Sequence, residues 1–94
     1  MAESGILSNI DRQMFLSMIE SAISPYIGAN MARASLKMHC DRLNLFNPVF
    51  TAEECEILLE KLAKGLHVFI GEHSTLAIIQ EIHQKMEEKG IHVA

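Results

Sequence analysis

The sequence predicts an all-α fold, a four-helix bundle made of two tandem helical-hairpin repeats related by a pseudo-twofold axis. Four stretches carry apolar residues at spacings of three and four, the pattern of helices with one buried face. Glycine and proline signals separate these stretches. The two halves also align without a gap at a shift of 43 residues. The 94 residues suit one domain, 1–94, with one hairpin over 8–46 and the other over 51–90.

The first hairpin is expected to begin at Ser8, the N-cap of a variant capping box that places Asp11 three residues on. Pro25 should end this helix, because proline disfavours the α conformation in the residue before it. A short turn then leads into a second helix over about 30–43. Residues 44–50, which contain a proline, are predicted to form a loop.

The second hairpin is expected to begin with the capping box of Thr51 and Glu54. Lys61 and Lys64 would lie in the last turn of its first helix, where cations complement the helix dipole, and Gly65 would cap that helix. A turn is predicted over 66–71, with a short strand as the alternative. The last helix should continue to about residue 89.

The repeat is clearest in the two turns, where Tyr26-Ile27-Gly28 aligns with Phe69-Ile70-Gly71 at the 43-residue shift. The alternative to a repeat is that any two amphipathic hairpins can be aligned, but the ungapped turn motif argues against it. One hairpin cannot bury its apolar stripe alone, so two must pack together. The aromatic residue and Ile of each turn should plug one end of the core. The glycine should allow close approach or a backbone angle closed to other residues.

Composition argues against several classes of protein. A net charge of −4 disfavours nucleic-acid binding and attachment to anionic lipid, both of which need a basic surface. The longest apolar runs are far shorter than a membrane span, and the N-terminus lacks the pattern of a secretory signal. Two cysteines without an export signal predict free thiols in the cytoplasm. Because the −4 falls entirely on residues 48–94, this half should prefer a basic or neutral partner.

Candidate chemistry is sparse. Adjacent His39 and Cys40 would point about 100° apart on a helix and could not easily share a metal ion. There is no Cys-x-x-Cys pair, glycine-rich phosphate loop or Gly-x-Ser-x-Gly elbow. We therefore expect no catalytic residue, no metal ligand and no cofactor, with Cys40 buried and His39 at the boundary of the core.

Methionines are frequent in the predicted helices and can bind soft copper or haem iron, but they also fill cores and adaptable contact surfaces. The apolar positions of the first helix cover more than the roughly 100° stripe that one-sided burial needs. This excess predicts a homodimer that also docks an unidentified protein, with no nucleic acid or membrane as partner. The expected interface residues are Ile10, Met14, Met18, Met31 and Met38.

The segment Ile23-Ser24-Pro25-Tyr26-Ile27-Gly28, with Ala32 four residues on, resembles small helical modules of bacterial signalling proteins. In those modules an aromatic-Ile-Gly turn joins two short helices, and some are appended to Ser/Thr protein kinases. They often carry proline after the glycine, whereas Ala29 and Glu72 stand here. The resemblance covers about twenty residues of each half. It implies a regulatory association domain without catalytic residues.

Two other functions stay open at this point. One is a sensor that holds a small molecule or a metal ion in the helical core through Met, His and Cys side chains. The other is a phosphotransfer bundle, which needs an exposed histidine in the middle of a helix; His39 and His83 are the candidates.

Overall fold

The computed structural model describes residues 10–90 of the chain and is predominantly helical. Its helices are α2 (Arg12–Ile27), α3 (Ala29–Leu43) and α4 (Ala52–Glu88). Two short strands, β1 (Ile10–Asp11) and β2 (Val49–Phe50), pair in antiparallel fashion. The all-α prediction is confirmed. The described chain has three helices rather than four, because α4 continues through the region expected to be a turn.

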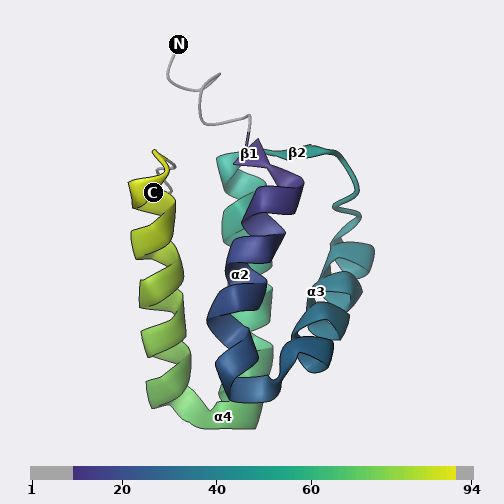
Figure 1. Cartoon of the computed structure of the whole chain (residues 1–94). Coiled ribbons are helices and arrows are strands. Elements are labelled where there is room, and N and C mark those ends of the chain that lie inside the picture. Colours follow the sequence, from purple (N-terminus) through teal and green to yellow (C-terminus); the bar gives the residue numbers. More distant parts are fainter. Residues whose placement is uncertain (1–9, 91–94) are drawn as a thin grey trace.

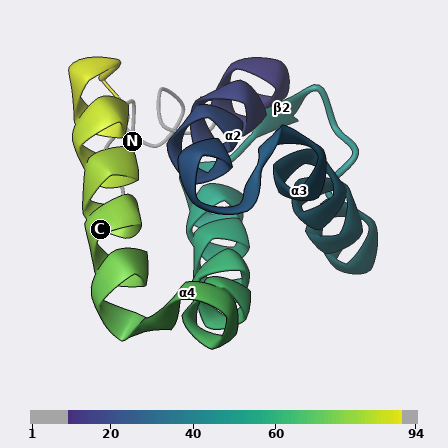
Figure 2. The same ribbon diagram turned by 60° about the horizontal axis from the view of Figure 1, so that its bottom comes forward.

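Helix α4 bends at Gly71, the one residue within it whose backbone angles (φ 87°, ψ 169°) are not helical. The bend divides α4 into a first arm, 52–70, and a second arm, 72–88. Figures 1 and 2 show the arms running antiparallel, with the second arm on the opposite side of α2 from α3. The turn expected over 66–71 is therefore confined to Gly71. Gly65 does not cap the helix, because burial of Leu66 continues the helical face beyond it.

Gly28 separates α2 from α3 with φ 89° and ψ 153°, close to the angles of Gly71. A side chain at either position would meet no atom within 4 Å, so the positive φ alone is what requires glycine. Of the two roles predicted for these glycines, the structure shows the backbone angle closed to other residues and not the close approach. The Gly28 N–H donates to the Ser24 carbonyl at 2.7 Å, which satisfies a group at the helix end.

Pro25 lies inside α2, so the prediction that it ends the helix is wrong. A proline in a helix removes one backbone donor and restricts the residue before it. The Ser24 hydroxyl donates to the Glu20 carbonyl at 2.6 Å in this turn. The helix continues to Ile27, whose side chain packs against the core, and it ends where Gly28 turns.

The start of α2 is capped by Asp11, whose carboxylate accepts a hydrogen bond from the Met14 N–H at 2.8 Å. The predicted cap, Ser8, lies outside the described residues. The loop before α4 is held against this helix start, because Arg12 donates from its backbone to the Pro48 carbonyl at 3.0 Å and from Nε to the Leu45 carbonyl at 3.2 Å. The paired strands were not predicted.

The capping box that begins α4 is confirmed. The Glu54 N–H donates to Thr51 Oγ1 at 3.0 Å, and the Thr51 N–H donates to Glu54 Oε1 at 2.9 Å. At the other end, α4 ends at Glu88, close to the predicted end at about residue 89, and Gly90 beyond it has a positive φ of 78°.

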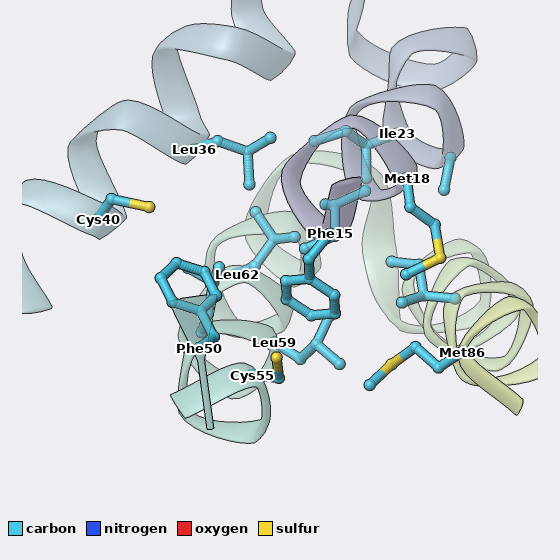
Figure 3. Packing of buried hydrophobic residues seen from close by; sticks show 14 of the residues in the cluster. Phe15, Met18, Ile23, Leu36, Cys40, Phe50, Cys55, Leu59, Leu62 and Met86 are labelled. Atoms are coloured by element: carbon cyan, nitrogen blue, oxygen red, sulfur yellow. The ribbon is translucent and has the colours of Figure 1, made fainter. Parts of the chain in front are cut away.

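The core lies between α2, which is central, and the helices on either side of it. Figure 3 shows Phe15 of α2 directed at Phe50 of β2; the ring centroids are 6.2 Å apart and the planes meet at 80°, an edge-to-face contact. Leu59 and Leu62 come from the first arm of α4, Met86 from the second arm and Leu36 from α3. One continuous core therefore joins all the described helices.

Candidate docking groove

A groove runs along the seam between α3 and the first arm of α4 and has a volume of about 520 Å³. We refer to it as the α3–α4 groove. Its apolar lining comes from the end of α2, from α3 and from α4, and consists of Ile27, Met38, Leu43, Leu62, Leu66 and Phe69. Met38 and Phe69 are 41 % and 67 % exposed, so apolar surface at the groove faces solvent.

Three cations line the same groove: Arg42 on the α3 wall and Lys61 and Lys64 on the α4 wall. No acidic residue in the part of the chain that the structure describes lines it. Within residues 10–90, none of the three cations forms a salt bridge, whereas Arg33, Lys37 and Lys85 each pair with a carboxylate. The groove is thus a basic site on a chain whose net charge is −4.

Because the first arm of α4 continues to residue 70, its lysines do not lie at a helix end as predicted. The sequence placed Lys61 and Lys64 in the last turn of a helix, where the dipole would favour them. In the structure they lie in the middle of the arm, and the dipole acts only within the terminal turn. Both lysines lie on the groove wall, outside the reach of the helix dipole.

His39 is half-buried in the α3 wall, opposite Gly65 of α4. A Cβ atom at position 65 would lie 3.9 Å from His39 Nε2, so the absence of a side chain there leaves the groove open beside the imidazole. Burial lowers the pKa of His39 below 6.5, and the charge of Arg42 lowers it further. His39 is therefore neutral at pH 7, and the positive charge of the groove comes from the Arg and Lys side chains.

The five predicted interface residues differ in how exposed their side chains are. Ile10 and Met18 are only 4 % and 7 % exposed, so the prediction that they contact a partner is wrong for these two. Ile10 pairs with Phe50 across the strands, and Met18 points to the side of the core that also holds Met86 (Figure 3). Met14 is half-buried. The two exposed members, at 45 % and 41 %, are Met31 and Met38.

Within each turn, the aromatic residue and the isoleucine also differ in exposure. Tyr26 and Phe69 are 47 % and 67 % exposed, so the expectation that they plug the core is wrong. Ile27 and Ile70 take the inward positions and pack against the core. Adjacent residues on a helix point about 100° apart, so the aromatic neighbour of each inward-facing isoleucine is turned toward solvent. Phe69 thereby becomes available to the groove.

Cys40 and Cys55 are both buried free thiols. Burial, together with the charges of Glu54 and Glu56, raises the pKa of Cys55 to about 12. Burial also raises the pKa of Cys40, although Arg12 opposes that shift. A thiol of raised pKa is protonated at neutral pH and is a poor nucleophile. Across residues 10–90, no three side chains of His, Cys, Asp or Glu gather as a metal site would require.

The phosphotransfer alternative required an exposed histidine in the middle of a helix. His39 and His83 are both half-buried. Nε2 of His83 is buried and finds no hydrogen-bond partner among the described residues. The His83 ring is therefore not presented openly to a phosphoryl donor, whereas the His39 ring borders the α3–α4 groove.

In the part of the chain that the structure describes, no helix combines the length and apolar character needed to cross a membrane. The feature with the clearest capacity for recognition is a groove that combines an apolar lining with three cations that form no salt bridge within residues 10–90. Comparison of the chain with protein-family models, with curated proteins and with solved structures found no match.

Proposed function

We propose that the chain is a small non-catalytic protein-interaction module and that the α3–α4 groove is its docking site. The observation that carries the proposal is an open apolar groove between two helices, with Met38 and Phe69 left exposed at it. Exposed apolar surface with a polar rim is typical of sites that bind other proteins. A groove walled by two helices suits a third helix, a common mode of peptide recognition.

We further propose that the fold is a four-helix bundle of two tandem hairpins, counting each arm of α4 as a helix. Gly28 and Gly71 support this proposal, because they are 43 residues apart in sequence and have nearly the same backbone angles. Buried residues at the same shift support it as well: Phe15 and Leu58, Ile19 and Leu62, Ile23 and Leu66. The pseudo-twofold relation would then make the α3–α4 seam equivalent to the seam between α2 and the second arm.

The proposed setting is bacterial regulation or signalling in the cytoplasm, on the strength of the aromatic-Ile-Gly turn and the free thiols. Self-association belongs to the same proposal. Met31 and Met38 are two turns apart on α3 and are both exposed, so either a second copy or another protein could use this helix. The sensor alternative would place its ligand among the buried Met and Cys side chains of the core.

The experiment is a selection of helical peptides of about 16 residues, displayed as a random library, on the immobilised full chain. Recovered peptides are then measured by calorimetry against two matched variants. Met38→Gln/Phe69→Gln removes apolar surface from the groove. Met31→Gln/Val68→Gln removes exposed apolar surface of the same helices outside it.

We expect the groove variant to weaken binding at least about tenfold and the control variant to change it by less than about twofold. Two results would overturn the docking function: a library that yields no binder, or equal losses in the two variants. Native mass spectrometry of the same proteins reports whether the chain itself dimerises and whether the groove variant abolishes the dimer.

A further inference from the structure

The charge of the α3–α4 groove indicates what kind of partner would fill it. Three of the eight Lys and Arg residues of the chain line this groove, and no Asp or Glu among residues 10–90 does. We propose that the occupant is an acidic amphipathic helix of a partner protein, an inference that rests on the proposed docking function.

The dimensions of the groove set the length of the helix. Its lining residues on α3 run from Ser35 to Leu43, and those on α4 run from Lys61 to Phe69. Each wall therefore spans about 12 Å at 1.5 Å per residue. This length accommodates about two turns of a docked helix, with two or three apolar anchors spaced as i, i+3 or i+4, and i+7.

The cations of the groove determine which charge a docked partner helix should carry. Arg42 comes from one wall and Lys61 and Lys64 from the other, so each wall of the groove carries a cation beside apolar residues. A docked helix would meet them with carboxylates on both flanks of its apolar stripe. The arginine can bind a carboxylate through two parallel hydrogen bonds, and the lysines supply point charges. No salt bridge within residues 10–90 competes for these three groups.

A second copy of the chain fits the groove less well. Its acidic helical surface at the start of α4 carries Glu53, Glu56 and Glu60 around one exposed apolar residue, Ile57, which is 40 % exposed. One anchor would leave most of the apolar lining uncovered. A nucleic acid would also present anionic groups, but the net charge of −4 opposes its approach. The combined apolar and basic lining favours an acidic helix from another protein.

The first part of the test is the charge of the peptides recovered from the library, considering only those lost on Met38→Gln/Phe69→Gln. We expect Asp and Glu to be enriched at positions flanking the apolar anchors. Neutral or basic peptides in this set would overturn the acidic partner and leave the docking function standing. A chain dimer abolished by the same variant would instead assign the groove to a second copy, which also overturns the proposal.

The second part compares two triple variants with the same change in net charge. Arg42→Gln/Lys61→Gln/Lys64→Gln removes the cations of the groove, and Arg33→Gln/Lys37→Gln/Lys85→Gln removes three cations that form salt bridges elsewhere. For an acidic peptide, the groove variant should weaken binding about tenfold or more, and the control should weaken it less than about threefold.

The third part replaces each Glu of the peptide with Gln. We expect the amide peptide to bind about tenfold more weakly and to lose most of the salt dependence between about 50 and 500 mM. Equal affinities of the two peptides, or equal losses in the two triple variants, would overturn the proposed charge of the partner. Circular dichroism of each variant separates these outcomes from loss of folding.

Discussion

The proposed repeat makes two seams of the molecule equivalent, and these seams differ in how their residues are buried. In the seam between α2 and the second arm of α4, Met18, Ile78, Ile82 and Met86 are all buried. Their counterparts at the α3–α4 seam are Lys61, Ser35, His39 and Leu43, and all four line the groove. The first set is entirely apolar and buried, and a surface hollow of about 420 Å³ beside it is lined by Met14, Met18 and Lys85. The second set substitutes a cation, a hydroxyl, an imidazole and one half-buried leucine.

Under the proposed repeat, the difference shows how two copies of one helical hairpin serve two purposes. A buried Met or Ile side chain contributes roughly 1.5–3 kcal/mol when it fills a seam. Polar replacements at equivalent positions give up that stabilisation and leave space that another helix can occupy. We use the name filled seam for the contact between α2 and the second arm through Met18, Ile78, Ile82 and Met86.

The largest expected effect compares equivalent residues of the two seams. Ile82→Ala should lower the free energy of unfolding by about 2–5 kcal/mol, because it leaves a cavity among fully buried neighbours. His39→Ala should lower it by less than about 1 kcal/mol, because the half-buried ring lines an open groove. Urea denaturation measures both, and equal losses would contradict the distinction between the seams.

The next effect tests the equivalence of the two turns. Gly28→Ala and Gly71→Ala should each destabilise the fold by about 1–2 kcal/mol, since both backbones hold a positive φ that disfavours a Cβ atom. The two losses should agree because the angles are nearly the same and neither position is crowded. Thermal unfolding followed by circular dichroism would reveal a discrepancy, which would indicate that the turns differ energetically.

A smaller effect of opposite sign is expected at Gly65. Here the glycine lies inside the first arm with no positive φ, and an added Cβ would make an ordinary contact with His39. Gly65→Ala should therefore stabilise the fold by about 0.5–1 kcal/mol through helix propensity. A loss of stability in the same urea assay would show that the groove cannot accept even a methyl group at this wall.

The smallest effect concerns pH. The pKa of His39 is lowered in the folded state relative to 6.5, by burial first and by Arg42 second. The unfolded chain consequently binds the proton more readily, so the stability due to this residue is complete above about pH 6.5 and decreases as the pH falls below it. Wild type and His39→Gln, compared by urea denaturation between about pH 5.5 and 8, should diverge only at the acidic end. If the free energies of unfolding of the two proteins change in parallel with pH, the lowered pKa of His39 is contradicted.

Local chemistry made part of the fold predictable. The Thr51–Glu54 capping box, the all-α class and the two special glycines each depend on residues close in sequence, and each is found in the structure. The ends of the first and third predicted helices were wrong for a different reason. Pro25 and Gly65 are local stop signals, but burial of Ile27 and Leu66 in the assembled core extends both helices past them.

The groove could not be predicted, because it brings together residues from two helices that are far apart in sequence. Counting charges by halves suggested a basic or neutral partner for residues 48–94. The structure instead places Lys61 and Lys64 beside Arg42 of the first half and produces a local basic site. The aromatic-Ile-Gly motif is visible in the sequence, yet only the structure shows that Phe69 faces outward.

The central claim is that the α3–α4 seam is left open for a docked helix. It is tested most directly by giving this seam the residues of the filled seam, in the variant Ser35→Ile/His39→Ile/Lys61→Met. Urea denaturation and calorimetry with a selected peptide are performed on the same protein. We predict a gain in the free energy of unfolding of about 1–3 kcal/mol together with at least about tenfold weaker peptide binding. Unchanged peptide affinity in a stably folded variant would contradict the claim.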